Sequence, residues 1–212
     1  MNMRTARLTL VLAFGALAAT AAPRTETVDF APGGTIRIDR ADGYLSIEAW
    51  DQPKVEITTN ETARAQITTS HPSPSELVIQ TELTHHPNFA KRVFHVGIHA
   101  DADYVIRVPR NSRLVVTRAN GYVGITGVAG DIEAHDRRGD IVLMLPDLAK
   151  CDIDARTKVG VVTSDTQGRM SNRRITGETF ASGKQQTRRL RLRMGFGGIT
   201  IKELPAEAIG PA

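Results

Sequence analysis

Apolar and polar residues alternate along almost the whole of residues 27–202, and this two-residue period is that of a β-strand. The pattern is clear in the segments TIRIDR, KVEITT and DIVLML. No window of about a dozen residues carries the apolar stripe of a helix. Thr, Val and Ile are abundant in these segments, and such side chains fit a pleated, half-buried surface. The sequence therefore predicts an all-β protein.

Glycines recur at the places where one alternating segment gives way to the next. The dipeptides that mark these places begin at residues 120, 138, 159 and 197, as Asn-Gly, Arg-Gly, Val-Gly and Gly-Gly. The steps between them are 18, 21 and 38 residues, and the last is close to twice the first two. A period of about 20 residues with one short strand per unit is typical of stacked coils. We therefore expect a single-domain, parallel β-solenoid or β-helix-like stack of short strands.

One stretch of nine residues occurs twice, as ADGYLSIEA at 41–49 and as ANGYVGITG at 119–127. Glycine permits a tight corner at positive φ, so the two copies are expected to be equivalent corner-and-strand units. Tyr44 and Tyr122 would then occupy matching places. Asp-Gly and Asn-Gly are also common hairpin turns. Two unrelated hairpins are therefore the alternative, and a β-sandwich is the competing fold.

Residues 1–21 have the organisation of a cleaved signal peptide. Two arginines precede the apolar run LTLVLAFGALAA, which is too short to span a bilayer, and Ala-Thr-Ala at 19–21 supplies a cleavage pattern. We expect export from a bacterial cytoplasm, to the periplasm, the cell surface or the medium. The mature chain is expected to hold no transmembrane segment. An uncleaved N-terminal anchor is the alternative.

The mature chain is expected to form one domain over 22–204, with a flexible tail at 205–212. Within the domain, the polar and weakly patterned segment 165–186 is expected to be a long loop, which accounts for the doubled glycine step. Cys151 is the one cysteine, so an internal disulfide is excluded. Its place in the alternating CDIDAR puts the thiol on the apolar face, as a core residue.

Four segments of the chain resemble a known family of exported bacterial proteins of unknown function, whose members are called putative adhesins. The segments are GYLSIEAWDQPKVEI (43–57), YVIRVPRNSRLVVTRANGYVGITGVAGDIEAHDRRGDIVLMLP (104–146), CDIDARTKVGVVTS (151–164) and RRLRLRMGFGGITI (188–201). The matching positions are Val108-Pro109, Gly121, Gly127, Gly130, Gly139, Leu190, Leu192, Gly198, Ile199 and Ile201. The resemblance covers about 27–203, apart from an elaborated hairpin at 83–103. It implies a β-solenoid-like fold, sometimes called a toastrack domain, and it identifies no functional residue.

Histidines and aspartates alternate with apolar residues in FHVGIHADAD, which places His95, His99, Asp101 and Asp103 on one strand face. Imidazole and carboxylate groups can bind a metal ion. However, residues four apart on a strand are about 13 Å apart, too far to bind one ion together. We therefore expect a solvated polar face and neither a metal nor another cofactor.

No catalytic centre is recognisable in the sequence. The patterns GxSxG and HExxH and the phosphate-binding loop do not occur in it. The acids Asp131, Glu133, Asp136, Asp140, Asp152 and Asp154 could converge on one solenoid face, as in polysaccharide lyases built on β-helices. A carbohydrate-active β-helix enzyme is therefore the alternative to the expected non-enzymatic protein.

Charge is distributed unevenly along the chain. Residues 22–136 carry 11 basic and 15 acidic side chains, whereas residues 137–202 carry 14 basic and 6 acidic ones. In TRRLRLRM the leucines are expected to face the core, which leaves a ladder of outward arginines. The predicted binding residues are this ladder and a neighbouring pair: Arg189, Arg191, Arg193, Arg137 and Arg138. Arg156 and Lys158 belong to the same basic segment.

The basic segment indicates the kind of partner. We expect an exported envelope or surface protein that binds an anionic envelope polymer or another envelope protein. Nucleic acid is not expected, because the protein is exported and only 5% of its residues are aromatic. Two alternatives are that the arginines only keep exposed strands soluble, and that the protein is a structural or sensory module that pairs through an open solenoid end.

Overall fold

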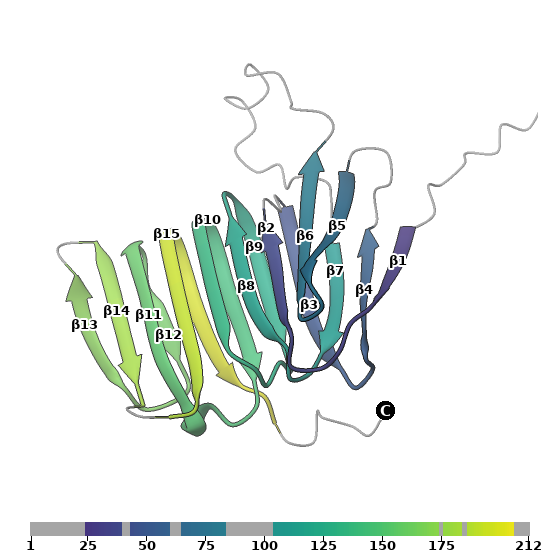
Figure 1. The fold of residues 1–212 in the computed structure, drawn as a ribbon. Coiled ribbons are helices and arrows are strands. Elements are labelled where there is room, and N and C mark those ends of the chain that lie inside the picture. Colours follow the sequence, from purple (N-terminus) through teal and green to yellow (C-terminus); the bar gives the residue numbers. More distant parts are fainter. Residues whose placement is uncertain are drawn as a thin grey trace, which may run out of the picture.

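The computed structural model describes residues 24–39, 43–59, 65–83, 104–173, 176–183 and 186–205. Within these residues, six units each contribute one strand to a first layer and one strand to a second layer (Figure 1). Four units have separate strands: β2 (Thr35–Asp39) with β3 (Gly43–Trp50), β6 (Glu76–Leu83) with β7 (Tyr104–Pro109), β8 (Arg113–Arg118) with β9 (Gly121–Thr126), and β11 (Cys151–Val159) with β12 (Val162–Ser164). In the other two, one long strand passes through both layers: β10 (Ile132–Leu145) and β15 (Arg188–Glu203).

Neighbouring units pair in parallel, with equivalent residues opposite each other. The order is β6, β2, β8, β10, β15, β11 in the first layer and β7, β3, β9, β10, β15, β12 in the second. The last unit of the chain, β15, therefore lies between β10 and β11. The all-β class and the stack of short parallel strands are confirmed. The β-sandwich alternative does not hold, because β10 and β15 run through both layers.

The aliphatic side chains of the two layers form one continuous core. Because the strands pair in register, equivalent residues form rows across the stack. One fully buried row crosses five units: Ile106, Ile47, Ile125, Leu143 and Ile201. Burying each such side chain stabilises the fold by about 1.5–3 kcal/mol. Cys151 is buried in the core as predicted, and burial raises the pKa of its thiol.

Antiparallel strands extend the stack at both ends. At one end β5 pairs with β6, β4 with β7 and β1 with β4; at the other, β14 pairs with β11 and β13 with β14. Their bounds are β1 (Arg24–Asp29), β4 (Lys54–Thr59), β5 (Ala65–Ser73), β13 (Arg169–Arg173) and β14 (Gly177–Ser182). A single 3₁₀ turn, η1 (Leu148–Lys150), precedes β11. The end strands cover edges that a bare stack would leave unpaired.

Strands β13 and β14 occupy part of the segment 165–186, where the sequence analysis predicts a long loop. That prediction is wrong for these two strands. The residues of β13 whose burial is described are all exposed, so neither of its faces is buried and no apolar alternation marks it as a strand. In β14 only one large apolar side chain, Phe180, reaches the core.

Glycines occupy the corners between the two layers, as the recurrent dipeptides predict. Gly121, Gly139, Gly160 and Gly197 have φ angles of 124°, 135°, 133° and 132°, a region that residues with a Cβ rarely adopt. Their spacing matters as much as their φ. A Cβ built on Gly139 would overlap the carbonyl oxygen of Gly121, and one built on Gly197 would overlap that of Gly139. Each corner therefore packs directly against the backbone of the next.

The repeated nine-residue stretch forms two adjacent units of the stack. Gly43 lies opposite Gly121 and Tyr44 lies opposite Tyr122 in the parallel pairing of β3 with β9. The two tyrosine rings are stacked, with centroids 4.7 Å apart and planes inclined by 6°. The prediction that these tyrosines occupy matching places is confirmed.

Some predictions concern residues outside the described ranges. They are the signal peptide at 1–21, the tail beyond Pro205, and the polar face of His95, His99, Asp101 and Asp103. These stay predictions. Among the helices of the described ranges, none has the length and apolar character needed to cross a bilayer.

Gly139→Ala tests the packing of one corner against the next. We expect a loss of at least about 4 kcal/mol in the free energy of unfolding, because the new methyl group would overlap backbone as well as strain φ. The matched control is Gly33→Ala. Gly33 also has a positive φ, of 86°, but a Cβ there would meet no atom within 4 Å, so we expect a loss of only about 1–2 kcal/mol. Urea unfolding measures both values, and equal losses would show that φ alone requires glycine at the corner.

Candidate functional site

The outward arginines of β15 lie between two acidic strands. Arg191 is opposite Glu133 of β10 and Asp154 of β11, and Arg189 is opposite Asp152. The backbone N–H of Arg189 donates to Asp131 Oδ1 at 2.8 Å. Arg189 and Arg191 are exposed, as the alternation predicts, but the flanking carboxylates offset their charge. This part of the first layer is therefore a mixed surface rather than a basic one.

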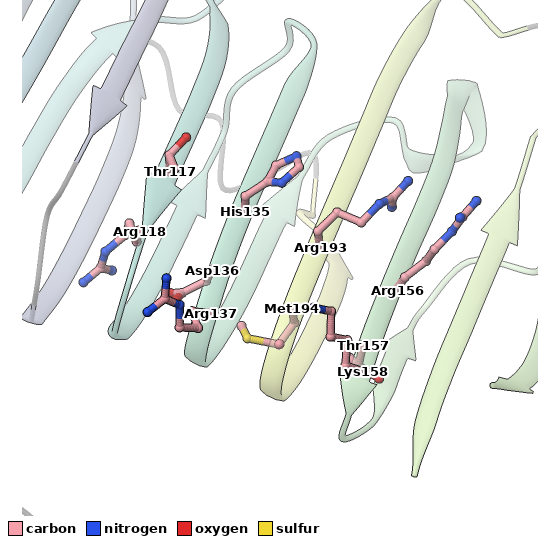
Figure 2. A pocket seen from close by; sticks show the side chains of 11 residues that line it. Thr117, Arg118, His135, Asp136, Arg137, Arg156, Thr157, Lys158, Arg193 and Met194 are labelled. Atoms are coloured by element: carbon pink, nitrogen blue, oxygen red, sulfur yellow. The ribbon is translucent and has the colours of Figure 1, made fainter. Parts of the chain in front are cut away.

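A groove of about 430 Å³ lies further along the same strands, where β8, β10, β15 and β11 approach their corners. Figure 2 shows the side chains that line it on these four neighbouring strands. The lining residues are Thr117, Arg118, His135, Asp136, Arg137, Arg156, Thr157, Lys158, Arg193, Met194 and Gly195. Five of them are arginine or lysine and only one is a carboxylate. We call this feature the cationic groove.

The parallel register explains how these residues come together. One row across the strands consists of Thr117, His135, Arg193 and Arg156, each opposite the next. Two positions further along, Gly195 lies between Arg137 and Lys158. A Cβ on Gly195 would overlap the carbonyl oxygen of Arg137, so the middle strand carries no side chain there. The groove is open between the two cationic side chains for this reason.

Two of the groove arginines are fixed by one carboxylate outside the lining. Arg156 Nε donates to Asp154 Oδ1 at 2.8 Å, and Arg193 Nη2 donates to Asp154 Oδ2 at 2.6 Å. Burial raises the pKa of the Asp154 carboxyl, but the hydrogen bonds from Arg193 and Arg156 outweigh it, so this pKa lies below its ordinary value. The two guanidinium groups are thus held in place, and they share one negative charge.

Arg118 and Asp136 are buried at the base of the groove, opposite each other in the register. Arg118 donates to the backbone oxygens of Tyr122 at 2.6 Å and Asn120 at 2.9 Å. Asp136 Oδ1 accepts a hydrogen bond from the backbone N–H of Arg138 at 3.1 Å. Both side chains therefore stabilise the corners. Arg137 and Lys158 differ from them, since both are exposed and neither forms an ion pair with another residue in the described part of the chain.

Arg188 shows that not every basic residue of this segment is a surface charge. Its guanidinium donates to the backbone oxygens of Gly130 at 3.0 Å and Pro146 at 2.9 Å, and to that of Val128. Burial lowers the pKa of this group. Arg188 thus holds the loop after β9 and the end of β10 against the start of β15, which is a structural role.

The five arginines predicted from the sequence fall into three places. Arg193 and Arg137 line the cationic groove. Arg138 lies on the adjacent corner, with its guanidinium carbon 5.9 Å from the centroid of the Phe196 ring. Arg189 and Arg191 lie outside the groove. The groove also includes His135 and the gap at Gly195, which the sequence analysis does not predict, because only the pairing of β10 with β15 brings them beside the cations.

The acidic residues considered for catalysis do not converge on one groove. Glu133 and Asp154 are separated by Arg191, and Asp152 is opposite Arg189 on the side of β15 away from β10. A general acid needs a raised pKa, whereas that of Asp154 is lowered. In the described residues, no three His, Cys, Asp or Glu side chains are placed to hold a metal ion.

Several solved structures are similar to this fold. A putative cell adhesion protein from Clostridium sporogenes has 11% sequence identity and a TM-score of 0.49, over 86% of this chain and all of that one. A putative adhesin from Bacteroides fragilis has 10% identity and a TM-score of 0.25, over 85% of this chain and 97% of that one. A putative adhesin from Parabacteroides distasonis has 12% identity and a TM-score of 0.28, over 85% of this chain and 65% of that one. No protein-family model and no curated protein matches the sequence. At these identities, the similar structures assign no functional residue to this chain.

Asp154→Asn tests the two-arginine clamp. We expect the free energy of unfolding at pH 7 to fall by about 1 kcal/mol, a value typical of partly exposed ion pairs. Because the folded-state pKa of Asp154 is depressed, its contribution is present above the ordinary aspartate pKa of about 3.9 and is lost as the pH falls through the folded value. The difference between wild type and variant should therefore shrink below about pH 4. Asp152→Asn, on the same strand without a clamp, is the control, and an equal loss at pH 7 would contradict the assignment.

Proposed function

We propose that this chain is an exported, non-enzymatic envelope or surface protein that binds an anionic partner in the cationic groove. The observation that carries the proposal is the composition of the groove, with five cationic side chains against one carboxylate. Arg137 and Lys158 are the cations most available to a ligand, because both are exposed and, unlike Arg156 and Arg193, neither forms an ion pair within the described residues. Their charges attract anions and form charge-assisted hydrogen bonds with them.

The strength of exposed ion pairs bears on the kind of partner. A single exposed pair contributes only about 0–1 kcal/mol, so one small anion would bind weakly. Neighbouring strands are about 4.8 Å apart, and the groove presents cations on β10, β15 and β11. A partner that carries several anionic groups can contact these strands together. A polyanion or an anionic surface therefore fits the groove better than an isolated ion.

The groove is better suited to binding than to catalysis. Its only carboxylate, Asp136, is buried and accepts a hydrogen bond from the corner backbone. The hydroxyl of Thr157 donates to the carbonyl oxygen of Gly160 at 2.9 Å, so it too supports the corner. A nucleophile would need an adjacent base. These two groups therefore serve the fold, and the exposed cations are left for a ligand.

Export is part of the proposal and rests on the signal-peptide pattern of residues 1–21. In bacterial cells fractionated into cytoplasm, periplasm and medium, we expect the protein outside the cytoplasm, with its N-terminus at Ala22. Peptide sequencing of the purified mature protein identifies that N-terminus directly. A cytoplasmic protein that retains residues 1–21 would contradict export and leave the binding proposal to be judged on its own test.

The double substitution Arg137→Gln and Lys158→Gln tests the groove. With inorganic polyphosphate as the probe, we expect binding about tenfold weaker, since two contacts of about 0.7 kcal/mol each are removed. Fluorescence anisotropy at two salt concentrations measures the affinity for polyphosphate. Added salt should reduce the difference in affinity between wild type and variant.

The matched control is the double substitution Arg189→Gln and Arg191→Gln. It removes the same charge from exposed positions outside the groove, so we expect affinity within about twofold of wild type. Equal weakening by both double variants would show that net charge, and not the groove, attracts the probe.

A further inference from the structure

Three large apolar side chains are exposed on the corners next to the cationic groove. Phe196 is 50% exposed, Val159 38% and Val161 58%. Phe196 lies opposite Val159 in the pairing of β15 with β11. Val161 is beside them, since its carbonyl oxygen accepts a hydrogen bond from Ile199 N–H at 3.0 Å. These side chains form one group, which we call the apolar corner.

The corner backbone holds this group on an outer edge of the stack. Gly197 follows Phe196, Gly160 separates Val159 from Val161, and a Cβ on Gly160 would overlap the carbonyl oxygen of Gly197. The two turns are therefore packed against each other without intervening side chains. The apolar side chains project from a closely packed backbone, so their exposure is a fixed property of the corner.

Cations surround the apolar corner. Arg138 is opposite Phe196 on its other side, and its guanidinium carbon is 5.9 Å from the centroid of the ring. Arg137 and Lys158, on either side of Gly195, are one residue before Arg138 and Val159 in the chain. Two acids are nearby: Asp140 Oδ1 accepts a hydrogen bond from Gly198 N–H at 2.8 Å, and Glu178 Oε2 accepts one from Val162 N–H at 2.7 Å. The edge thus combines exposed apolar groups with an excess of positive charge.

This combination matches the chemistry of an anionic membrane surface. Acyl chains offer an apolar environment to Phe and Val, and anionic headgroups attract Arg and Lys. A water-soluble polyanion would contact the cations but would leave the side chains of the apolar corner in water. A protein interface of standard size buries roughly 800 Å² per partner, which takes many more residues than the three apolar side chains of this corner.

We propose that the anionic partner is a lipid bilayer, which the apolar corner enters at headgroup depth while the cations of the groove contact anionic headgroups. This inference rests on the proposed anion-binding function and deepens it. Phe196 and Val161 would lie at the boundary between headgroups and acyl chains. Arg137, Arg138 and Lys158 would contact phosphate oxygens beside them.

Flotation of the full mature chain with vesicles tests the inference. We expect binding to vesicles of phosphatidylglycerol and phosphatidylcholine and none to vesicles of phosphatidylcholine alone. The double substitution Phe196→Ser and Val161→Ser should weaken vesicle binding at least tenfold, yet leave polyphosphate binding within about twofold of wild type. Met170→Ser is the control, because Met170 is 49% exposed on β13, away from the corner, and it should change neither.

The outcomes separate the two proposals. If the wild type binds polyphosphate but not phosphatidylglycerol vesicles, the lipid inference fails and the groove proposal stands. If it binds neither, both fail. If the Phe196→Ser and Val161→Ser variant binds vesicles as wild type does, the apolar corner is not the contact. If that variant instead loses binding to poly-glutamate while vesicles are not bound, the partner is an acidic protein and the lipid inference is overturned.

A fluorescence readout reports insertion directly. Trp50 is the one tryptophan of the chain, so Phe196→Trp combined with Trp50→Phe places a single reporter on the corner. Its emission should shift to the blue with phosphatidylglycerol vesicles and stay unchanged with polyphosphate. An unchanged emission with vesicles that do bind the protein would show that the corner remains in water, and would overturn the insertion.

Discussion

Direct contact of backbone with backbone at the corners is the constraint on which the rest of this structure depends. Because Gly121, Gly139 and Gly197 have no side chains, neighbouring units approach until one corner touches the carbonyl of the next. That approach fixes the register of β9, β10 and β15 at their corners, and the register places aliphatic residues of different units in common rows. The same register determines which charged residues become neighbours on the outer surface.

The order of units across the stack decides the electrostatics of that surface. β15 carries outward arginines, and its neighbours β10 and β11 carry outward acids at equivalent positions. Near the start of these strands, neighbouring acids therefore offset the excess of basic residues in the segment 137–202. In the described part of this surface, positive charge accumulates near the corners, where Arg137, Arg156, Lys158 and Arg193 are neighbours. The cationic groove is thus defined by pairing rather than by composition.

Much of the fold could be predicted from local sequence, because strands and glycine corners are local features. The alternation predicts the strands, and the repeated nine residues predict the stacked Tyr44 and Tyr122. Two features could not be predicted in this way. The position of β15 between β10 and β11 depends on pairing between residues far apart in the chain. β13 is exposed on both faces, so its sequence carries no period. The groove depends on the position of β15. The sequence therefore predicts Arg193 and Arg137 as basic surface residues, but it does not predict that His135 and Gly195 lie beside them.

The place of β15 has a consequence for how the protein acquires its structure. β15, the last strand in the described part of the chain, pairs along its first half with both β10 and β11, and along its second half with β10 and β12. Until residues 188–203 are available, β10 and β11 have no partner on these sides, and the two parts of the stack are joined only by the chain. The described part of the stack therefore cannot be completed strand by strand in the order of the sequence, because the strand that joins its two parts follows both of them in the chain.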